Sequence, residues 1–133
     1  MTYLLDTDIC SYIIRSPFVL REKFESVSAG EIAISSITWA ELHSWIVNST
    51  KPERRLLSLQ KMFAPVSILP FNATDATFHG PIRKHLKERG QLIGALDILI
   101  AAHGVSRGLI IVTNNTEHFS RVPQLKVENW LSQ

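Results

Sequence analysis

Three carboxylates stand far apart in the sequence, each next to an apolar run. Asp6 ends the run YLL, Glu41 lies one turn into an expected helix, and Asp97 interrupts the small-residue segment GALDILIAAH at 94–103. An ionised acid among apolar residues is costly unless it is paired, hydrogen-bonded or bound to a cation. No Lys or Arg stands one helical turn from Asp97, at positions 93, 94, 100 or 101, so its partner must come from elsewhere in the chain.

The elements that must position these acids can be predicted from the pattern of apolar residues. The predicted strands are 3–6, 31–35, 66–71 and 109–113, with a short fifth at 126–130. The predicted helices are 8–15, 17–26, 38–48, 52–63, 73–89 and 94–107. This alternation is typical of an α/β fold with a central, mostly parallel sheet of four or five strands and helices on both faces. The chain contains no repeat or long linker, so we expect one domain over 1–133.

Parallel sheets bind ligands beyond the carboxyl ends of their strands, where all three acids are expected to lie. Two carboxylates about 4 Å apart repel by about 4 kcal/mol at an effective dielectric of about 20. A cluster of three therefore needs protons or a metal ion. Oxygen ligands favour Mg²⁺ or Mn²⁺ over zinc. We therefore predict a divalent metal site held by Asp6, Glu41 and Asp97.

Several of these residues also have a simpler structural interpretation. Thr38 and Glu41 have the spacing of a capping box, in which Glu41 binds only the backbone at the helix start. Asp8 is expected to be the N-cap of the first helix. The histidines show no tight metal-ligand spacing, so we expect His103 and His118 to be packing or surface residues.

The composition sets limits on the class of protein. The net charge of +2 is too small to establish nucleic-acid binding by itself. If the three acids share one site, the rest of the chain has 14 basic and 9 acidic residues, or +5, which suits a phosphate-bearing substrate. The single Cys10 cannot form an internal disulfide, and the most apolar region, 92–112, is interrupted by charges. We expect a cytoplasmic protein without a membrane segment.

Four sequence blocks resemble the successive motifs of the PIN domain. They are LLDTDI at 4–9, ISSITWAEL at 34–42, GQLIGALDILIAAHG at 90–104 and IVTNNTEHFSRV at 111–122. The tail LKVENW at 125–130 resembles the end of the VapC branch, the toxins of bacterial toxin–antitoxin pairs. The resemblance keeps order and spacing over nearly the whole chain.

This resemblance implies an endoribonuclease that depends on Mg²⁺ or Mn²⁺, cuts loops of tRNA or rRNA and inhibits translation. It places the catalytic, metal-binding acids at Asp6, Glu41 and Asp97. At the fourth acidic position, where many members have Asp, this chain has Asn114-Asn115, with Glu117 close by. The resemblance also implies a VapB-type antitoxin that fills the active-site groove, and a larger assembly with antitoxin and operator DNA.

Further roles follow from this hypothesis. The hydroxyl of Thr7 or Thr113 is a candidate to orient a metal-bound water. The candidates for contacts to the RNA backbone are Arg15, Arg83, Lys84, Lys87 and Arg121. The apolar helices 38–48 and 52–63 favour a homodimer.

Two other hypotheses stay open at this point. An RNA-binding PIN domain without catalysis is favoured by the Asn pair at 114–115. An aspartyl-phosphate phosphotransfer domain is suggested by LLDTDIC, which loosely resembles the D-x-D-x-T start of haloacid-dehalogenase phosphatases, although position 10 is Cys. A receiver domain would need an Asp after the middle strand, where 66–71 leads to Asn72.

Overall fold

Five short strands form one parallel sheet in the computed structural model, which describes residues 1–131. In spatial order they are β3 (Ser67–Leu69), β2 (Ile32–Ser35), β1 (Tyr3–Leu5), β4 (Ile110–Val112) and β5 (Lys126–Glu128). Every neighbouring pair is parallel. The predicted α/β fold with a parallel sheet is confirmed.

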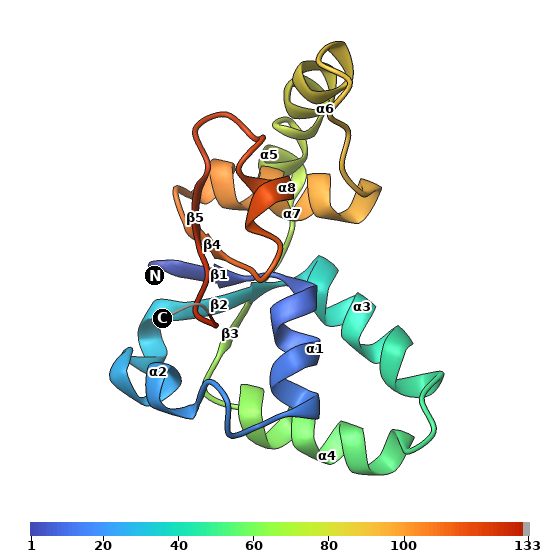
Figure 1. The fold of residues 1–133 in the computed structure, drawn as a ribbon, viewed down its shortest axis with the longest axis vertical. Helices are drawn as coiled ribbons and strands as arrows, with labels where there is room; N and C mark the ends of the chain where they lie inside the picture. The colour runs from blue at the N-terminus through green and yellow to red at the C-terminus, as the bar shows by residue number, and fades with distance from the viewer. Residues whose placement is uncertain (132–133) are drawn as a thin grey trace.

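Helices cover both faces of this sheet (Figure 1). One face carries α1 (Thr7–Arg15), α2 (Arg21–Ser26), α3 (Ser36–Val47) and α4 (Pro52–Phe63). The other carries α5 (Ala73–Ala76), α6 (His79–Glu88), α7 (Ala95–Arg107) and α8 (Thr116–Phe119). A short 3₁₀ turn, Ala29–Glu31, precedes β2. Among the described residues, no helix is long and apolar enough to cross a membrane.

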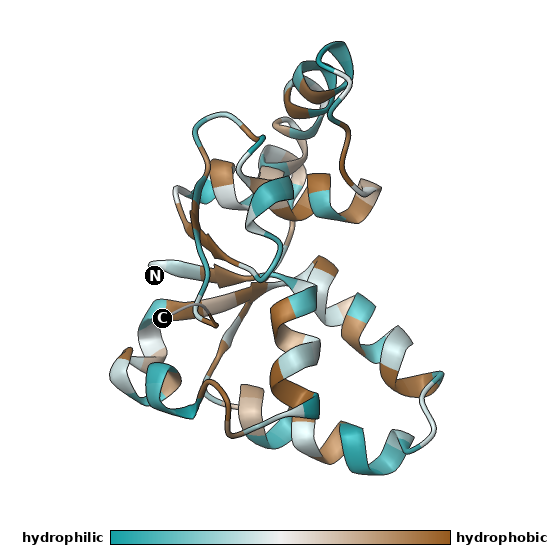
Figure 2. Cartoon of the chain, viewed as in Figure 1, coloured by the Kyte–Doolittle hydropathy of each residue, from teal (hydrophilic) through white to brown (hydrophobic). Residues whose placement is uncertain are grey.

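The strands are apolar on both faces because both faces are buried. Paired positions in register alternate between the two cores, as the pleat of a strand requires. The core under α1–α4 receives Leu5, Ile34 and Val112. The core under α6–α8 receives Leu4, Ala33 and Ile111, and β2 and β4 are accordingly brown in Figure 2.

Two predicted helices have the wrong bounds. The helix predicted at 17–26 begins only at Arg21, because residues 17–20 form turns. The helix predicted at 73–89 is divided into α5 and α6. A continuous helix would press the Pro81 ring against the carbonyl of Thr77, four residues earlier, and Pro81 has no N–H to donate to it. The break at 77–78 puts Pro81 into the first turn of α6, where proline is tolerated.

A buried polar network ties α5 and α7 to the end of β2. The carboxylate of Asp75 accepts hydrogen bonds from the Ser106 hydroxyl (2.7 Å), Arg107 Nε (2.9 Å) and Arg107 Nη2 (3.1 Å). On the same face of α7, the His103 ring lies between Asp75 and β2: its Nε2 is 3.6 Å from Asp75 Oδ2, and its Nδ1 is 2.8 Å from the Ser35 hydroxyl. Burial alone would raise the pKa of Asp75, but these hydrogen bonds and one from the Asn72 N–H hold it well below its usual range.

Replacement of Asp75 by Asn should lower the free energy of unfolding by about 3 kcal/mol, because Arg107 loses its buried counter-charge. The matched variant Ser106→Ala removes only one neutral donor and should cost about 1 kcal/mol. Urea unfolding measures both values. An equal decrease in the free energy of unfolding in the two variants would contradict a stabilising role of the Asp75–Arg107 ion pair.

Comparison of the wild type with Asp75→Asn also tests how the free energy of unfolding depends on pH. Folding lowers the pKa of Asp75. The contribution of the Asp75 charge to the free energy of unfolding is therefore complete above the unfolded pKa of about 4 and declines as the pH falls below it. The difference between the wild type and Asp75→Asn should therefore shrink in acid. A difference that grows on acidification would contradict this assignment.

Candidate active site

The strand order reverses between β1 and β4, and ligands of open α/β sheets bind in the crevice beyond such a reversal. Asp6 directly follows β1, and Thr113 directly follows β4. The Thr113 hydroxyl donates a hydrogen bond to Asp6 Oδ2 at 2.6 Å. Asp6 is only 2% exposed, so this bond lies at the floor of the crevice.

Asp6 is also the N-cap of α1. Its Oδ1 accepts the Ile9 N–H at 2.9 Å, so the prediction that Asp8 caps this helix is wrong. Burial raises the pKa of Asp6 to about 7, against the lowering effect of the bonds from Thr113 and Ile9, and the charges of Asp8 and Asp97 raise it further. Near neutral pH, this carboxyl therefore needs a proton or a cation.

Glu41 comes to the site from α3. The Ser35 hydroxyl accepts the Ile37 N–H at 3.1 Å and so caps this helix, which places Thr38 inside it. The capping-box interpretation of Thr38 and Glu41 is therefore wrong. Instead, the Thr7 hydroxyl donates to Glu41 Oε1 at 2.6 Å, which joins α1 to α3.

Asp97 lies in the first turn of α7 and is half-buried. Burial raises its pKa, and the charges of Glu41 and Asp8 raise it further, whereas His118 lowers it. A Cβ atom on Gly94 would lie 3.3 Å from Asp97 Oδ2, so the carboxylate folds back over the helix start. The positive end of the helix dipole is there, but the charged neighbours of Asp97 are mainly other acids.

An open hollow of about 440 Å³, which we call the carboxylate pocket, collects the side chains of Glu41 and Asp97, whereas Asp6 is not part of its lining. It is lined by Thr7, Asp8, Ser11, Arg15, Glu41, Leu42, Trp45 and Asp97. Asp8 is a pocket residue that the sequence analysis missed. Its signal is the spacing DTD at 6–8: once Asp6 caps the helix, Asp8 falls in the first turn beside the crevice.

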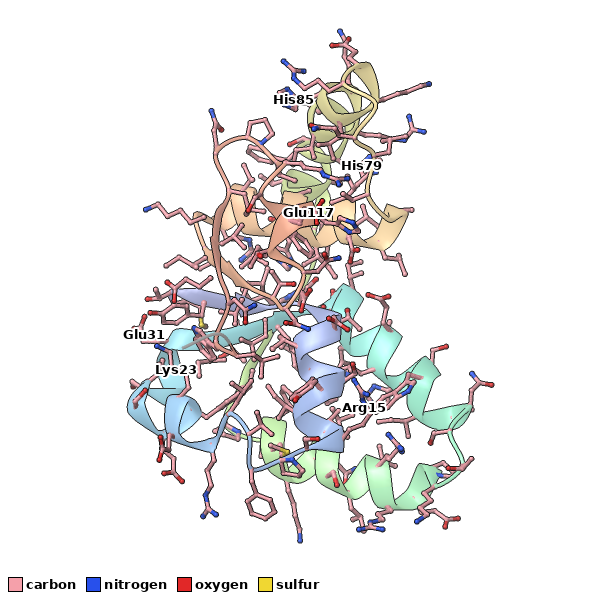
Figure 3. The ribbon with its side chains drawn as sticks, in the orientation of Figure 1. Arg15, Lys23, Glu31, His79, His85 and Glu117 are labelled. Atoms are coloured by element: carbon pink, nitrogen blue, oxygen red, sulfur yellow. The ribbon has the colours of Figure 1, made fainter. Side chains whose placement is uncertain are left out.

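The two residues predicted for the fourth acidic position lie differently. The Asn115 N–H donates to the Thr113 hydroxyl at 2.8 Å, and its side-chain amide lies 2.7 Å from His118 Nδ1. The Glu117 side chain is 85% exposed and forms an ion pair with Arg121 at 3.5 Å. Figure 3 shows Glu117 on α8, a helix not predicted from the sequence. Sequence reasoning also missed the proximity of His118 to Asp97.

The predicted RNA-binding residues are spread over the surface. Arg15, at the end of α1, lines the carboxylate pocket. Three others are exposed on α6, which lies at the opposite end of the view from α4 in Figure 1: they are Arg83, Lys84 and Lys87. Arg121 pairs with Glu117 and donates to the Gln91 carbonyl at 3.5 Å.

The donor set of the carboxylate pocket suits a hard cation. Apart from Arg15, its charged groups are carboxylates, and the charges of Glu41 and Asp8 raise the pKa of Asp97, a repulsion that a cation would relieve. Within residues 1–131, no three His, Cys, Asp or Glu side chains are close enough to hold a metal ion alone. Mg²⁺ is typically bound by one or two carboxylates together with water and substrate phosphate, so such an open arrangement fits it.

The topology also bears on the phosphotransfer hypothesis. Receiver domains have the flavodoxin-like strand order 2-1-3-4-5. The order here is 3-2-1-4-5, and Asn72 follows β3 where a phosphorylatable Asp would be needed. The fold therefore argues against a receiver domain.

Comparison with known proteins identifies the family of this chain. The family model of the PIN domain matches residues 3–125 and defines the class of protein. The chain is 40% identical to the tRNA(fMet)-specific endonuclease VapC of Shigella flexneri and to ribonuclease VapC2 of Haemophilus influenzae, over 98% of this chain and at least 98% of each relative. VapBC2 from Rickettsia felis, solved with a promoter DNA fragment, superposes with a TM-score of 0.91 at 37% identity, covering 98% of this chain and 99% of that one. The chain belongs to the VapC family of PIN-domain ribonucleases.

In metal-free buffer, the Asp6 carboxyl should titrate with a pKa of about 7 by carbon-13 NMR. Thr113→Val should raise that pKa, because it removes a hydrogen bond that favours the charged form. Thr113→Ser keeps the hydroxyl and should retain the wild-type value. An Asp6 pKa near 4 in the wild type, or no change in Thr113→Val, would contradict the described environment.

Proposed function

We propose that this chain hydrolyses phosphodiester bonds of RNA with Mg²⁺ or Mn²⁺ bound at the carboxylate pocket. PIN ribonucleases are metal-dependent enzymes, in keeping with the oxygen-rich pocket. The observation that carries the proposal is the electrostatic coupling of Asp97 with Asp6, Asp8 and Glu41, four acids from three helices and one strand end. Such repulsion is costly in a folded protein and is relieved by a divalent cation.

Asp6, Glu41 and Asp97 are the residues that would hold the ion, with Asp8 as a further acid at the rim. When bound, the ion supplies Lewis-acid chemistry: it neutralises phosphate charge and lowers the pKa of a coordinated water. Thr113 holds Asp6 by one oxygen, and Thr7 holds Glu41 in the same way. Thr7 also lines the pocket, where its hydroxyl oxygen can orient water. Asn115 supports the Thr113 hydroxyl and takes the fourth position.

We further propose tRNA as the substrate class, because a 40% identical relative is named for cleavage of tRNA(fMet). A VapB-type antitoxin is the proposed partner, since the matching structures include VapBC complexes, two of them solved with DNA. We also propose that the chain is cytoplasmic and forms a homodimer. This homodimer would bind operator DNA together with the antitoxin.

A mostly apolar hollow beside the site supports antitoxin binding. Its volume is about 550 Å³, and its lining is Ser36, Ile37, Ala40, Glu41, Ser44, Trp45, Asn48 and Leu96. Glu41 and Trp45 also line the carboxylate pocket, so a peptide seated here would reach the acids. This is the place we assign to the C-terminal segment of the antitoxin.

Asp97→Asn should reduce Mg²⁺-dependent cleavage of tRNA by about 100-fold or more, because it removes a negative ligand from the pocket. The matched control Glu117→Gln changes an exposed acid that pairs with Arg121 and should retain wild-type cleavage. Gel analysis of purified tRNA, with and without EDTA, measures both. Full cleavage by Asp97→Asn, or by the wild type in EDTA, would contradict the metal mechanism.

The same assay separates a second candidate, an RNA-binding domain without catalysis. That candidate is favoured by the outward position of Glu117, which leaves Asn115 at the fourth position. It predicts tRNA binding without new RNA ends at any Mg²⁺ or Mn²⁺ concentration.

A further inference from the structure

A second hollow, which we call the basic pocket, lies between the end of α1 and the start of α4. Its volume is about 390 Å³. It is lined by Ile14, Arg15, Pro17, Thr50, Lys51, Arg54, Arg55 and Ser58. Three arginines and one lysine thus share one hollow, and no acidic residue of the described part of the chain is in its lining.

The charges of this pocket are not compensated by the protein. None of the ion pairs within residues 1–131 involves Arg15, Lys51, Arg54 or Arg55. Four like charges around one hollow repel one another, and an anion in the hollow relieves that repulsion. Guanidinium groups bind phosphate oxygens through two parallel hydrogen bonds, which makes phosphate the anion that three arginines fit best.

The basic pocket adjoins the carboxylate pocket at one shared residue. Arg15 lines both. Asp8, Ser11 and Arg15 are spaced three and four residues apart, so one face of α1 runs from the acidic to the basic end, and Figure 3 shows Arg15 on the side of α1 toward α3. The helical rise puts Asp8 and Arg15 about 10 Å apart along the axis, a distance that one nucleic-acid strand can span.

An aromatic ring connects the two pockets on the α3 side. The Arg55 guanidinium lies 4.8 Å from the Trp45 ring centroid, and Trp45 lines the carboxylate pocket. A half-buried tryptophan beside stacked arginine is a platform on which a nucleobase can stack. A nucleic-acid strand supplies both the phosphates for the arginines and the flat bases for this ring, so the combination favours a nucleic-acid strand.

We propose that the basic pocket binds backbone phosphates of the substrate RNA next to the bond that is cut in the carboxylate pocket. This inference rests on the proposed function, because it takes RNA as the strand that crosses both pockets. It assigns Lys51, Arg54 and Arg55 to RNA binding together with Arg15, whereas Arg83, Lys84 and Lys87 on α6 line neither pocket.

The double variant Lys51→Gln/Arg54→Gln tests this assignment. Both side chains are exposed, so the fold should be retained, which circular dichroism checks. The matched control is Lys61→Gln/Arg21→Gln, which removes one lysine from another part of α4 and one arginine from α2, at a different hollow. The probe is fluorescein-labelled tRNA in EDTA, so that binding is measured by anisotropy without cleavage.

The Kd of the double variant should rise about tenfold or more at low salt, and the slope of log Kd against log salt should fall by about 1.4, or about 0.7 for each lost cation. The control should keep the wild-type Kd and slope. In Mg²⁺, kcat/KM should fall by the same factor as binding while kcat at saturating tRNA is retained.

The outcomes separate this inference from the proposed function. Wild-type cleavage with an unchanged Kd and slope in the double variant would overturn the basic pocket and leave the nuclease standing. An unchanged Kd for tRNA combined with lost affinity for a poly-glutamate peptide would also overturn it. If the double variant has the reduced salt slope but the wild type cleaves no RNA, the basic pocket would be supported and the nuclease refuted.

Discussion

The hydrogen bond from Thr113 to Asp6 joins the carboxyl ends of β1 and β4 where the strand order reverses, and the site is built around it. A buried carboxylate is costly, and among the groups of residues 1–131 only the Thr113 hydroxyl and the Ile9 N–H offset part of that cost. Neither carries a positive charge. The remaining negative potential, increased by Asp97, is what makes the crevice suited to a cation.

The other acids depend on helices that the core holds in register. Ser35 caps α3, which carries Glu41, and the same hydroxyl contacts His103 on α7, which carries Asp97. Asp75 then fixes the far end of α7 through Arg107. The acids of the pocket therefore approach one another because buried polar contacts determine where their helices lie, against the repulsion between them.

The sequence predicted the strands and the parallel sheet well because buried strands are short apolar runs, and Asp97 indicated a shared site because an acid in such a helix lacks a local partner. The N-cap could not be predicted, since Asp6 and Asp8 are both good caps and only the end of β1 decides between them. The break before α6 is caused by Pro81, but the apolar pattern runs on through 73–89 and gives no sign of it. The position of His118 depended on α8, whose single turn has no periodic signal.

Anomalous scattering from a crystal soaked with Mn²⁺ tests the central claim most directly, because it locates the ion without reference to activity. The account predicts the strongest Mn²⁺ peak between the carboxylates of Asp6 and Asp97, and its loss in Asp97→Asn crystals. A peak at exposed acids such as Glu117, or none at the crevice beyond β1 and β4, would contradict it.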